Sequence, residues 1–161
     1  MKKINIPFVI IGIILLSTIL FSACSIPISS KQKKPNNQYY YNLLANNIVY
    51  NKKYTISVLD TNFYKNKKVE NKNLSILMHF MNSISKNNFI KKPNDLPSKP
   101  AYKLFFEFKN EKFVINIYNE KYISIYPWDG KYEMDYLDMS NVYAAYNLYG
   151  FCKYLIPENN D

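Results

Sequence analysis

The sequence predicts an α+β fold in which an antiparallel sheet is packed on one face by two helices, a two-layer sandwich. Two segments carry apolar residues at helical spacing, which is typical of helices with one buried face. Between these segments, four short stretches alternate apolar and polar side chains. The connections between the four stretches are so short that neighbouring strands must be antiparallel. We therefore expect a four-stranded meander beneath two helices.

The first of the two helices is predicted from Leu74 to Ser85, with Asn73 as its N-cap. A strand is expected at residues 54–59, where the side chains alternate and are rich in β-branched types. A further short helix is possible within residues 39–49. Residues 60–72 and 86–100 are polar and are expected to be loops. The apolar face of the first helix is formed by Leu74, Leu77, Met78, Met81 and Ile84.

The meander is predicted at residues 102–108, 113–117, 122–126 and 131–137, each with period-two alternation. The second helix is expected at residues 141–155. Asp138 or Ser140 would cap the amino end of this helix. Its inner side would carry Val142, Ala145, Tyr146, Tyr149 and Cys152.

The amino terminus has the layout of a secretory signal peptide, which we place at residues 1–23. Lys2 and Lys3 are followed by an apolar run of about fifteen residues from Pro7 to Phe21. That run is short for a bilayer core of roughly 30 Å, which favours a signal segment over a permanent span. The two lysines would hold the amino terminus in the cytoplasm, so that the following chain crosses outward.

The end of this segment, Phe21-Ser22-Ala23-Cys24, resembles the bacterial lipobox. The resemblance implies cleavage between Ala23 and Cys24 and attachment of lipid, with acyl chains such as palmitate, to the Cys24 thiol. Phe21 departs from the lipobox, where leucine is usual. Two acyl chains suffice for stable anchoring. We therefore expect a protein anchored on the extracytoplasmic face of the cell membrane. An uncleaved signal anchor, or an ordinary signal peptide with an incidental cysteine, are the alternatives.

After Cys24 the chain is polar up to Gln38, which predicts a flexible tether over residues 24–38 and a single globular domain over residues 39–161. Lys31, Lys33 and Lys34 would lie near the lipid. They would either contact anionic headgroups or serve only to keep the tether soluble.

The chain is strongly basic, with a formal net charge of +9, and every basic residue is a lysine. Removal of Lys2 and Lys3 leaves nineteen lysines against twelve acidic residues. Such a charge attracts anionic lipid or an anionic cell-wall polymer. A nucleic-acid partner is not expected, because no arginine is present to make forked contacts to phosphate and guanine.

Trp128 is the single tryptophan and lies in a predicted turn with Asp129, between Tyr126 and Tyr132. An aromatic side chain in a loop beside a carboxylate can stack on a sugar ring or clamp a peptide. These four residues form the candidate ligand surface. The simpler alternative is packing, in which Trp128 folds back over the edge of the sheet, because large aromatic side chains mostly serve packing.

Catalytic and metal-binding residues are sparse. Glu133 and Asp135 would point into solvent from one face of a strand, with Lys131 to pair with, although two carboxylates can also serve a hydrolase. Cys152 is expected to be a buried apolar thiol, and His79 is the only histidine that could activate it. Neither a catalytic group, a metal site nor a cofactor is predicted.

The lipobox, the tether, the order strand, helix, meander and helix, and the segment Tyr126-Pro127-Trp128-Asp129-Gly130 together resemble small clostridial lipoproteins of unknown function. This resemblance covers nearly the whole chain and implies a compartment and a fold. We expect a non-enzymatic envelope lipoprotein that binds a protein or a wall polymer. A small envelope hydrolase and a sensor or inhibitory domain acting on a membrane protein remain as alternatives.

Overall fold

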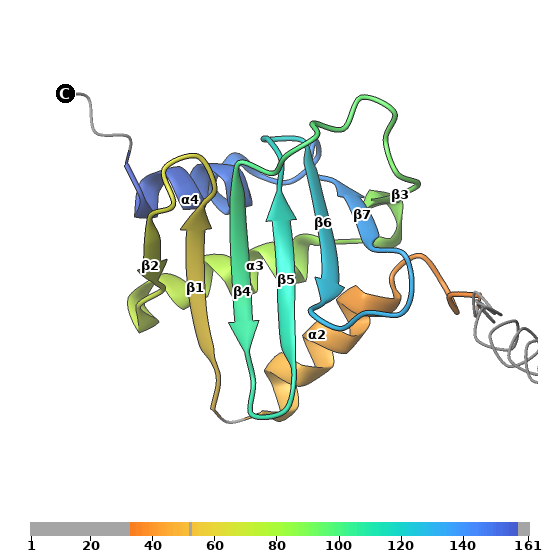
Figure 1. Cartoon of the computed structure of the whole chain (residues 1–161), viewed down its shortest axis with the longest axis horizontal. Coiled ribbons are helices and arrows are strands. Elements are labelled where there is room, and N and C mark those ends of the chain that lie inside the picture. The colour runs from red at the N-terminus through yellow and green to blue at the C-terminus, as the bar shows by residue number, and fades with distance from the viewer. Residues whose placement is uncertain (1–32, 52, 158–161) are drawn as a thin grey trace, which may run out of the picture. The chain divides into compact units, whose positions relative to one another are not determined.

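The computed structural model describes residues 33–51 and 53–157, which form one seven-stranded antiparallel sheet with helices on one face (Figure 1). The sheet has the order β2-β1-β4-β5-β6-β7-β3. The strands are β1 (Thr55–Asp60), β2 (Asn66–Lys68), β3 (Phe89–Ile90), β4 (Tyr102–Glu107), β5 (Lys112–Ile117), β6 (Tyr122–Pro127) and β7 (Asp135–Asp138). The helices of the described chain are α2 (Tyr39–Tyr50), α3 (Leu74–Ser83) and α4 (Leu148–Leu155).

The core lies between the sheet and the three helices. Alternate residues of the central strands point into it, among them Leu104 and Phe106 of β4 and Ile115 of β5, each at most 1% exposed. Burial of such a side chain stabilises the fold by about 1.5–3 kcal/mol. The described residues, 33–51 and 53–157, belong to one compact unit that contains this whole core. The helices contribute chiefly Tyr40, Leu44, Leu77, Phe80, Leu148 and Cys152.

The remaining side chains of the strands point to the opposite face of the sheet, which no helix of the described residues covers (Figure 1). Strand register places Phe105 of β4 beside Val114 of β5, and Val114 beside Tyr126 of β6. Val114 is fully buried between these two aromatic neighbours, which are themselves half-buried. We call this side the open face. It mixes aromatic side chains with charged ones such as Lys103 and Glu107.

Most of the predicted elements are confirmed, but the sheet is wider and the helices are more numerous than expected. The possible helix within residues 39–49 exists as α2, so three helices and not two cover the sheet. The segments 60–72 and 86–100 were expected to be loops, yet they contain β2 and β3. The prediction missed β2 because all its residues are polar and exposed, which leaves no alternation to detect.

The last strand and the last helix are shorter than predicted. β4 to β7 do form a meander, but β7 begins at Asp135 because residues 131–134 belong to the preceding loop. The hydroxyl of Tyr40 accepts a hydrogen bond from the backbone N–H of Tyr132 at 2.7 Å, which holds this loop against α2. α4 starts at Leu148, and Ala145 is exposed. Within the described ranges no helix combines the length and apolar character needed to cross a membrane.

Candidate functional site

Trp128 lies at the end of β6 and is largely exposed to solvent. Its backbone N–H donates to the carbonyl of Lys112 at 2.7 Å, so the ladder between β5 and β6 fixes the start of the turn. The side chain is 64% exposed. Its ring contacts Phe105 on the open face, with the ring centroids 6.5 Å apart. The packing interpretation therefore accounts for one contact of Trp128 but leaves most of the indole available to a ligand.

The positively charged side chain of Lys112 lies close to the rings of both Phe105 and Trp128 on the open face. Its Nζ lies 4.7 Å from the ring centroid of Phe105 and 5.4 Å from that of Trp128. It also pairs with a carboxylate oxygen of Glu107 at 2.7 Å. The hydrogen bond from Lys112 lowers the pKa of Glu107, which keeps that carboxylate ionised. Trp128, Phe105 and Lys112 form a platform whose rings are held in place before any ligand arrives.

An open depression of about 450 Å³ adjoins this platform. Its charged lining consists of Glu107, Lys109, Glu111, Lys112 and Asp129. Three carboxylates thus face two ammonium groups beside an exposed indole. Such a lining offers hydrogen-bond acceptors to hydroxyl or amide groups, while the ring offers a flat apolar surface.

The structure brings together only some of the four predicted ligand-surface residues. Trp128 and Asp129 line the same depression, and Tyr126 is half-buried on the open face, where burial raises its pKa. Tyr132 instead packs against α2, with its ring centroid 5.5 Å from that of Tyr39. Phe105 and Lys112 were missed, because their position beside Trp128 follows from strand register and not from their neighbours in sequence.

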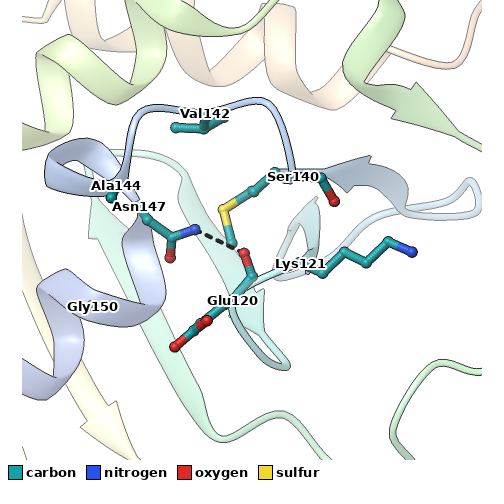
Figure 2. A pocket seen from close by; sticks show the side chains of 8 residues that line it. Glu120, Lys121, Ser140, Val142, Ala144, Asn147 and Gly150 are labelled. Carbon is teal, nitrogen blue, oxygen red and sulfur yellow. Dashed lines mark hydrogen bonds between the residues drawn. The ribbon is translucent and has the colours of Figure 1, made fainter.

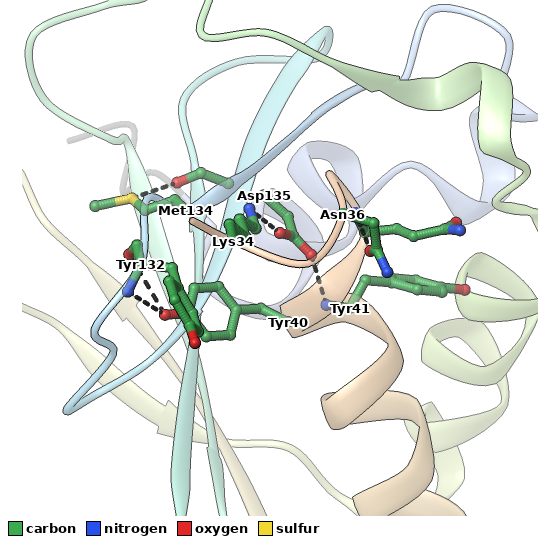
Figure 3. A network of polar contacts seen from close by, with 9 residues as sticks. Lys34, Asn36, Tyr40, Tyr41, Tyr132, Met134 and Asp135 are labelled. Atoms are coloured by element: carbon green, nitrogen blue, oxygen red, sulfur yellow. Dashed lines mark hydrogen bonds and ion pairs between the residues drawn. The ribbon is translucent and has the colours of Figure 1, made fainter. Parts of the chain in front are cut away.

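Asp135 forms a second polar cluster, shown in Figure 3. Its carboxylate is fully buried, accepts the backbone N–H of Tyr41 at 2.7 Å and makes an ion pair with Lys34. Burial raises the pKa of Asp135, and the ion pair with Lys34 offsets part of that rise. The expected solvent-facing pair of Glu133 and Asp135 is wrong, since only Glu133 is exposed and precedes the strand. Asp135 holds the amino end of α2 against β7 and is paired with Lys34, not with Lys131.

The thiol of Cys152 is buried in the core, as the sequence predicted. It is 0% exposed, and desolvation raises its pKa far above that of a free thiol. His79 is exposed on α3 and stacks on the ring of Tyr146, with centroids 4.7 Å apart. A thiol held protonated and away from solvent is a poor nucleophile.

A further depression, of about 500 Å³, lies between the β5–β6 turn and the start of α4 (Figure 2). Asn147 crosses it, donating from Nδ2 to the carbonyl of Glu120 at 2.7 Å. Glu120 and Lys121 stand at one side, and Val142 and Ala144 at the other. Across the part of the chain that the structure describes, no three of the usual metal-ligating side chains gather at one point.

The fold and this surface define a small α+β domain with an exposed aromatic platform. The family model described as "Domain of unknown function (DUF4883)" matches residues 34–152, and the chain belongs to that family.

Among solved structures, the chain is similar to the crystal structure described as "Putative Lipoprotein from Clostridium perfringens". The two are 32% identical with a TM-score of 0.69, and the match covers 78% of this chain and 100% of that one. No curated protein matches the chain. The predicted resemblance to a clostridial lipoprotein is confirmed. Neither the family nor the neighbour indicates an enzymatic activity.

Proposed function

We propose that the protein is a lipoprotein anchored through acylated Cys24 on the extracytoplasmic face of the membrane, and that its domain binds sugar units of a cell-envelope glycan at Trp128. The observation that carries the binding role is the exposure of Trp128 on a platform completed by Phe105 and Lys112. An indole that is exposed yet positioned by its neighbours is suited to stacking on the apolar face of a sugar ring.

The anchor is supported by the signal-like segment before Cys24 and by the likeness to a clostridial protein described as a lipoprotein. A non-enzymatic role is supported by the positions of the residues that a hydrolase would need. Asp135 is engaged in a buried ion pair, and Cys152 is a protonated core thiol. Glu133 therefore lacks the second carboxylate, Asp135, with which it could have formed a catalytic pair.

The charges around Trp128 favour an uncharged sugar over an anionic wall polymer. Glu107, Glu111 and Asp129 line the depression beside the indole, against Lys109 and Lys112. A phosphate-bearing polymer would meet more negative than positive charge there. Sugar hydroxyls, by contrast, would donate hydrogen bonds to these carboxylates while the ring stacks on Trp128.

Binding of the chain 24–161 to purified peptidoglycan and to soluble glycan fragments tests this proposal. Trp128 is the single tryptophan, so its fluorescence reports directly on contact with the ligand. We expect a change in emission on binding, and about tenfold weaker binding of Trp128→Ala, the size of one good stacking contact. Tyr143→Ala is the matched control, since Tyr143 is 69% exposed away from this depression. Unchanged emission, or equal binding by both variants, would refute the glycan role.

The anchor is tested separately by the mass of intact protein from cells. We expect loss of residues 1–23 and a mass increase on Cys24 equal to that of the lipid, with Cys24→Ala released from the membrane fraction. A full-length chain without acyl mass would contradict the anchor.

A further inference from the structure

The chain enters the folded domain at a fixed point, set by Lys34. The ammonium of Lys34 is paired with Asp135, and its side chain is only 17% exposed. It also lies 5.3 Å from the ring centroid of Tyr40. Figure 3 shows Lys34 and Asp135 meeting beside the start of α2. The ion pair therefore attaches the start of the domain to β7, at one side of the sheet.

A basic rim surrounds this entry point. An open depression of about 700 Å³ is lined there by Lys33, Lys34, Lys91, Lys92 and Glu133. Lys33, Lys91 and Lys92 are exposed, and none of them has an ion-pair partner among the described residues. Lys34 is neutralised by Asp135, so three free ammonium groups face one carboxylate. We call Lys33, Lys91 and Lys92 the basic rim.

We propose that the basic rim is the side of the domain that docks on the anionic phospholipid headgroups of the membrane. This inference rests on the proposed anchor at Cys24. Only the nine residues 25–33 separate Cys24 from Lys34. Fully extended, they reach about 30 Å, and less in any relaxed state. The entry point thus stays close to the bilayer.

Charge then selects which side of the domain faces the lipid. The potential of an anionic membrane falls off within about 10 Å, so only lysines beside the entry point feel it strongly. Lys91 and Lys92 directly follow β3, the edge strand next to β7. The opposite edge, β2, carries a comparable lysine-lined depression with Lys53 and Lys68. These two lysines carry the same charge as Lys91 and Lys92. Lys68 belongs to β2 and Lys53 precedes β1, at the far side of the sheet from β3, which makes the two a matched control.

The chain 24–161, coupled through Cys24 to a maleimide lipid in vesicles, tests the docking. Coupling is selective, because the chain has two cysteines and Cys152 is buried. Acetylation of each lysine, followed by mass spectrometry, reports its accessibility. On vesicles containing phosphatidylglycerol we expect Lys91 and Lys92 to react about fivefold more slowly than on phosphatidylcholine alone, the effect of one favourable lysine–membrane contact. Lys53 and Lys68 should react at the same rate on both.

Charge reversal gives an independent readout. Lys91→Glu with Lys92→Glu should abolish the slowing at Lys33, whereas Lys53→Glu with Lys68→Glu should leave it intact. Equal slowing of acetylation at Lys91 and Lys92 and at Lys53 and Lys68 would show a general electrostatic attraction and overturn the proposal. Acetylation of the rim lysines at an unchanged rate would overturn it as well. Chemical coupling replaces cellular acylation, so this result does not depend on the mass test of Cys24. If soluble glycan, and not anionic lipid, slowed acetylation of the rim lysines, the basic rim would bind a different ligand and the proposal would also be overturned.

Discussion

The ionisation of Asp135 affects the stability of the fold, because its carboxylate is buried and desolvation raises its pKa. Below pH 3.8, the ordinary pKa of the group, it is protonated in both the folded and the unfolded chain. Between pH 3.8 and the higher folded pKa, only the unfolded chain ionises. The stability that protonated Asp135 provides is therefore complete at low pH and is lost as the pH rises through the folded pKa.

Asp135→Asn isolates this effect, since asparagine keeps an acceptor for the N–H of Tyr41 and does not titrate. We expect the free energy of unfolding of the native chain, minus that of the variant, to fall as the pH rises from 3 to 7. The fall should amount to about 1.4 kcal/mol for each unit by which the folded pKa exceeds the ordinary one. Urea unfolding of both chains at each pH measures it. A difference that grows with pH would show that Lys34 outweighs desolvation.

Cys152 gives a second prediction at the residue scale. Because its thiol is fully buried and its pKa is raised, iodoacetamide should leave Cys152 unmodified in the folded chain at pH 8 and modify it after unfolding in urea. In an unacylated chain, Cys24 provides the internal comparison. Rapid modification of native Cys152 would mean that the thiol reaches solvent, and the hydrolase alternative would regain its nucleophile.

At the scale of elements, Asn147 determines where α4 begins. Its side chain accepts the N–H of Tyr149 at 3.0 Å and donates to the carbonyl of Glu120 at 2.7 Å. One side chain thus caps the helix and ties it to the β5–β6 turn. Asn147→Ala should lower the free energy of unfolding by about 1–2 kcal/mol, the usual cost of a lost N-cap with an added hydrogen bond.

Asn147→Asp separates the two roles. Aspartate retains the cap and can no longer donate to Glu120, so we expect a smaller loss than for alanine. Urea unfolding at neutral pH compares the two variants with the native chain. An alanine variant as stable as the native chain would mean that tertiary packing alone fixes the start of α4.

The same helix shows what sequence patterns could and could not predict. The apolar spacing after Asn141 was read as continuous helix, but residues 144–146 form a 3₁₀ turn. The N-cap is Asn147, so the prediction of Asp138 or Ser140 as the cap is wrong. Where a pattern was strong, in β4 to β6 and α3, the elements were placed to within a few residues. The two edge strands escaped prediction because β2 is wholly polar and β3 has only two residues.

The candidate site follows the same division. Trp128 and Asp129 could be predicted, since both belong to one turn. Lys112 lies beside Trp128 through the pairing of β5 with β6, and Phe105 through the further pairing of β4 with β5, which no local pattern contains. The ion pair of Lys34 with Asp135 joins residues a hundred positions apart and was equally hidden. The surface of the site thus depends on contacts between residues far apart in the sequence, whereas the local apolar patterns predict only the core beneath it.

For the whole molecule, the contacts of the domain that the structure describes include those of Lys34, which lies within the segment predicted to be tether. A chain starting at residue 32 should therefore unfold in one cooperative transition, because the whole described core lies beyond that point. A chain starting at Asn36 loses Lys34 and leaves Asp135 buried without its partner. Removing one member of a buried ion pair lowers the free energy of unfolding by about 3 kcal/mol. The loss is smaller here if Asp135, the remaining member, takes up a proton.

Calorimetry of the two chains measures the difference, with Lys34→Ala in the longer chain as the control. If the ion pair is the cause, Lys34→Ala and the shorter chain should lose equal stability, and both losses should shrink at acid pH as Asp135 becomes protonated. Equal melting temperatures for the chains starting at residues 32 and 36 would instead place the boundary of the domain after Lys34. The amino-terminal segment would then be free to swing, and the basic rim would no longer be held at the point where the chain meets the membrane.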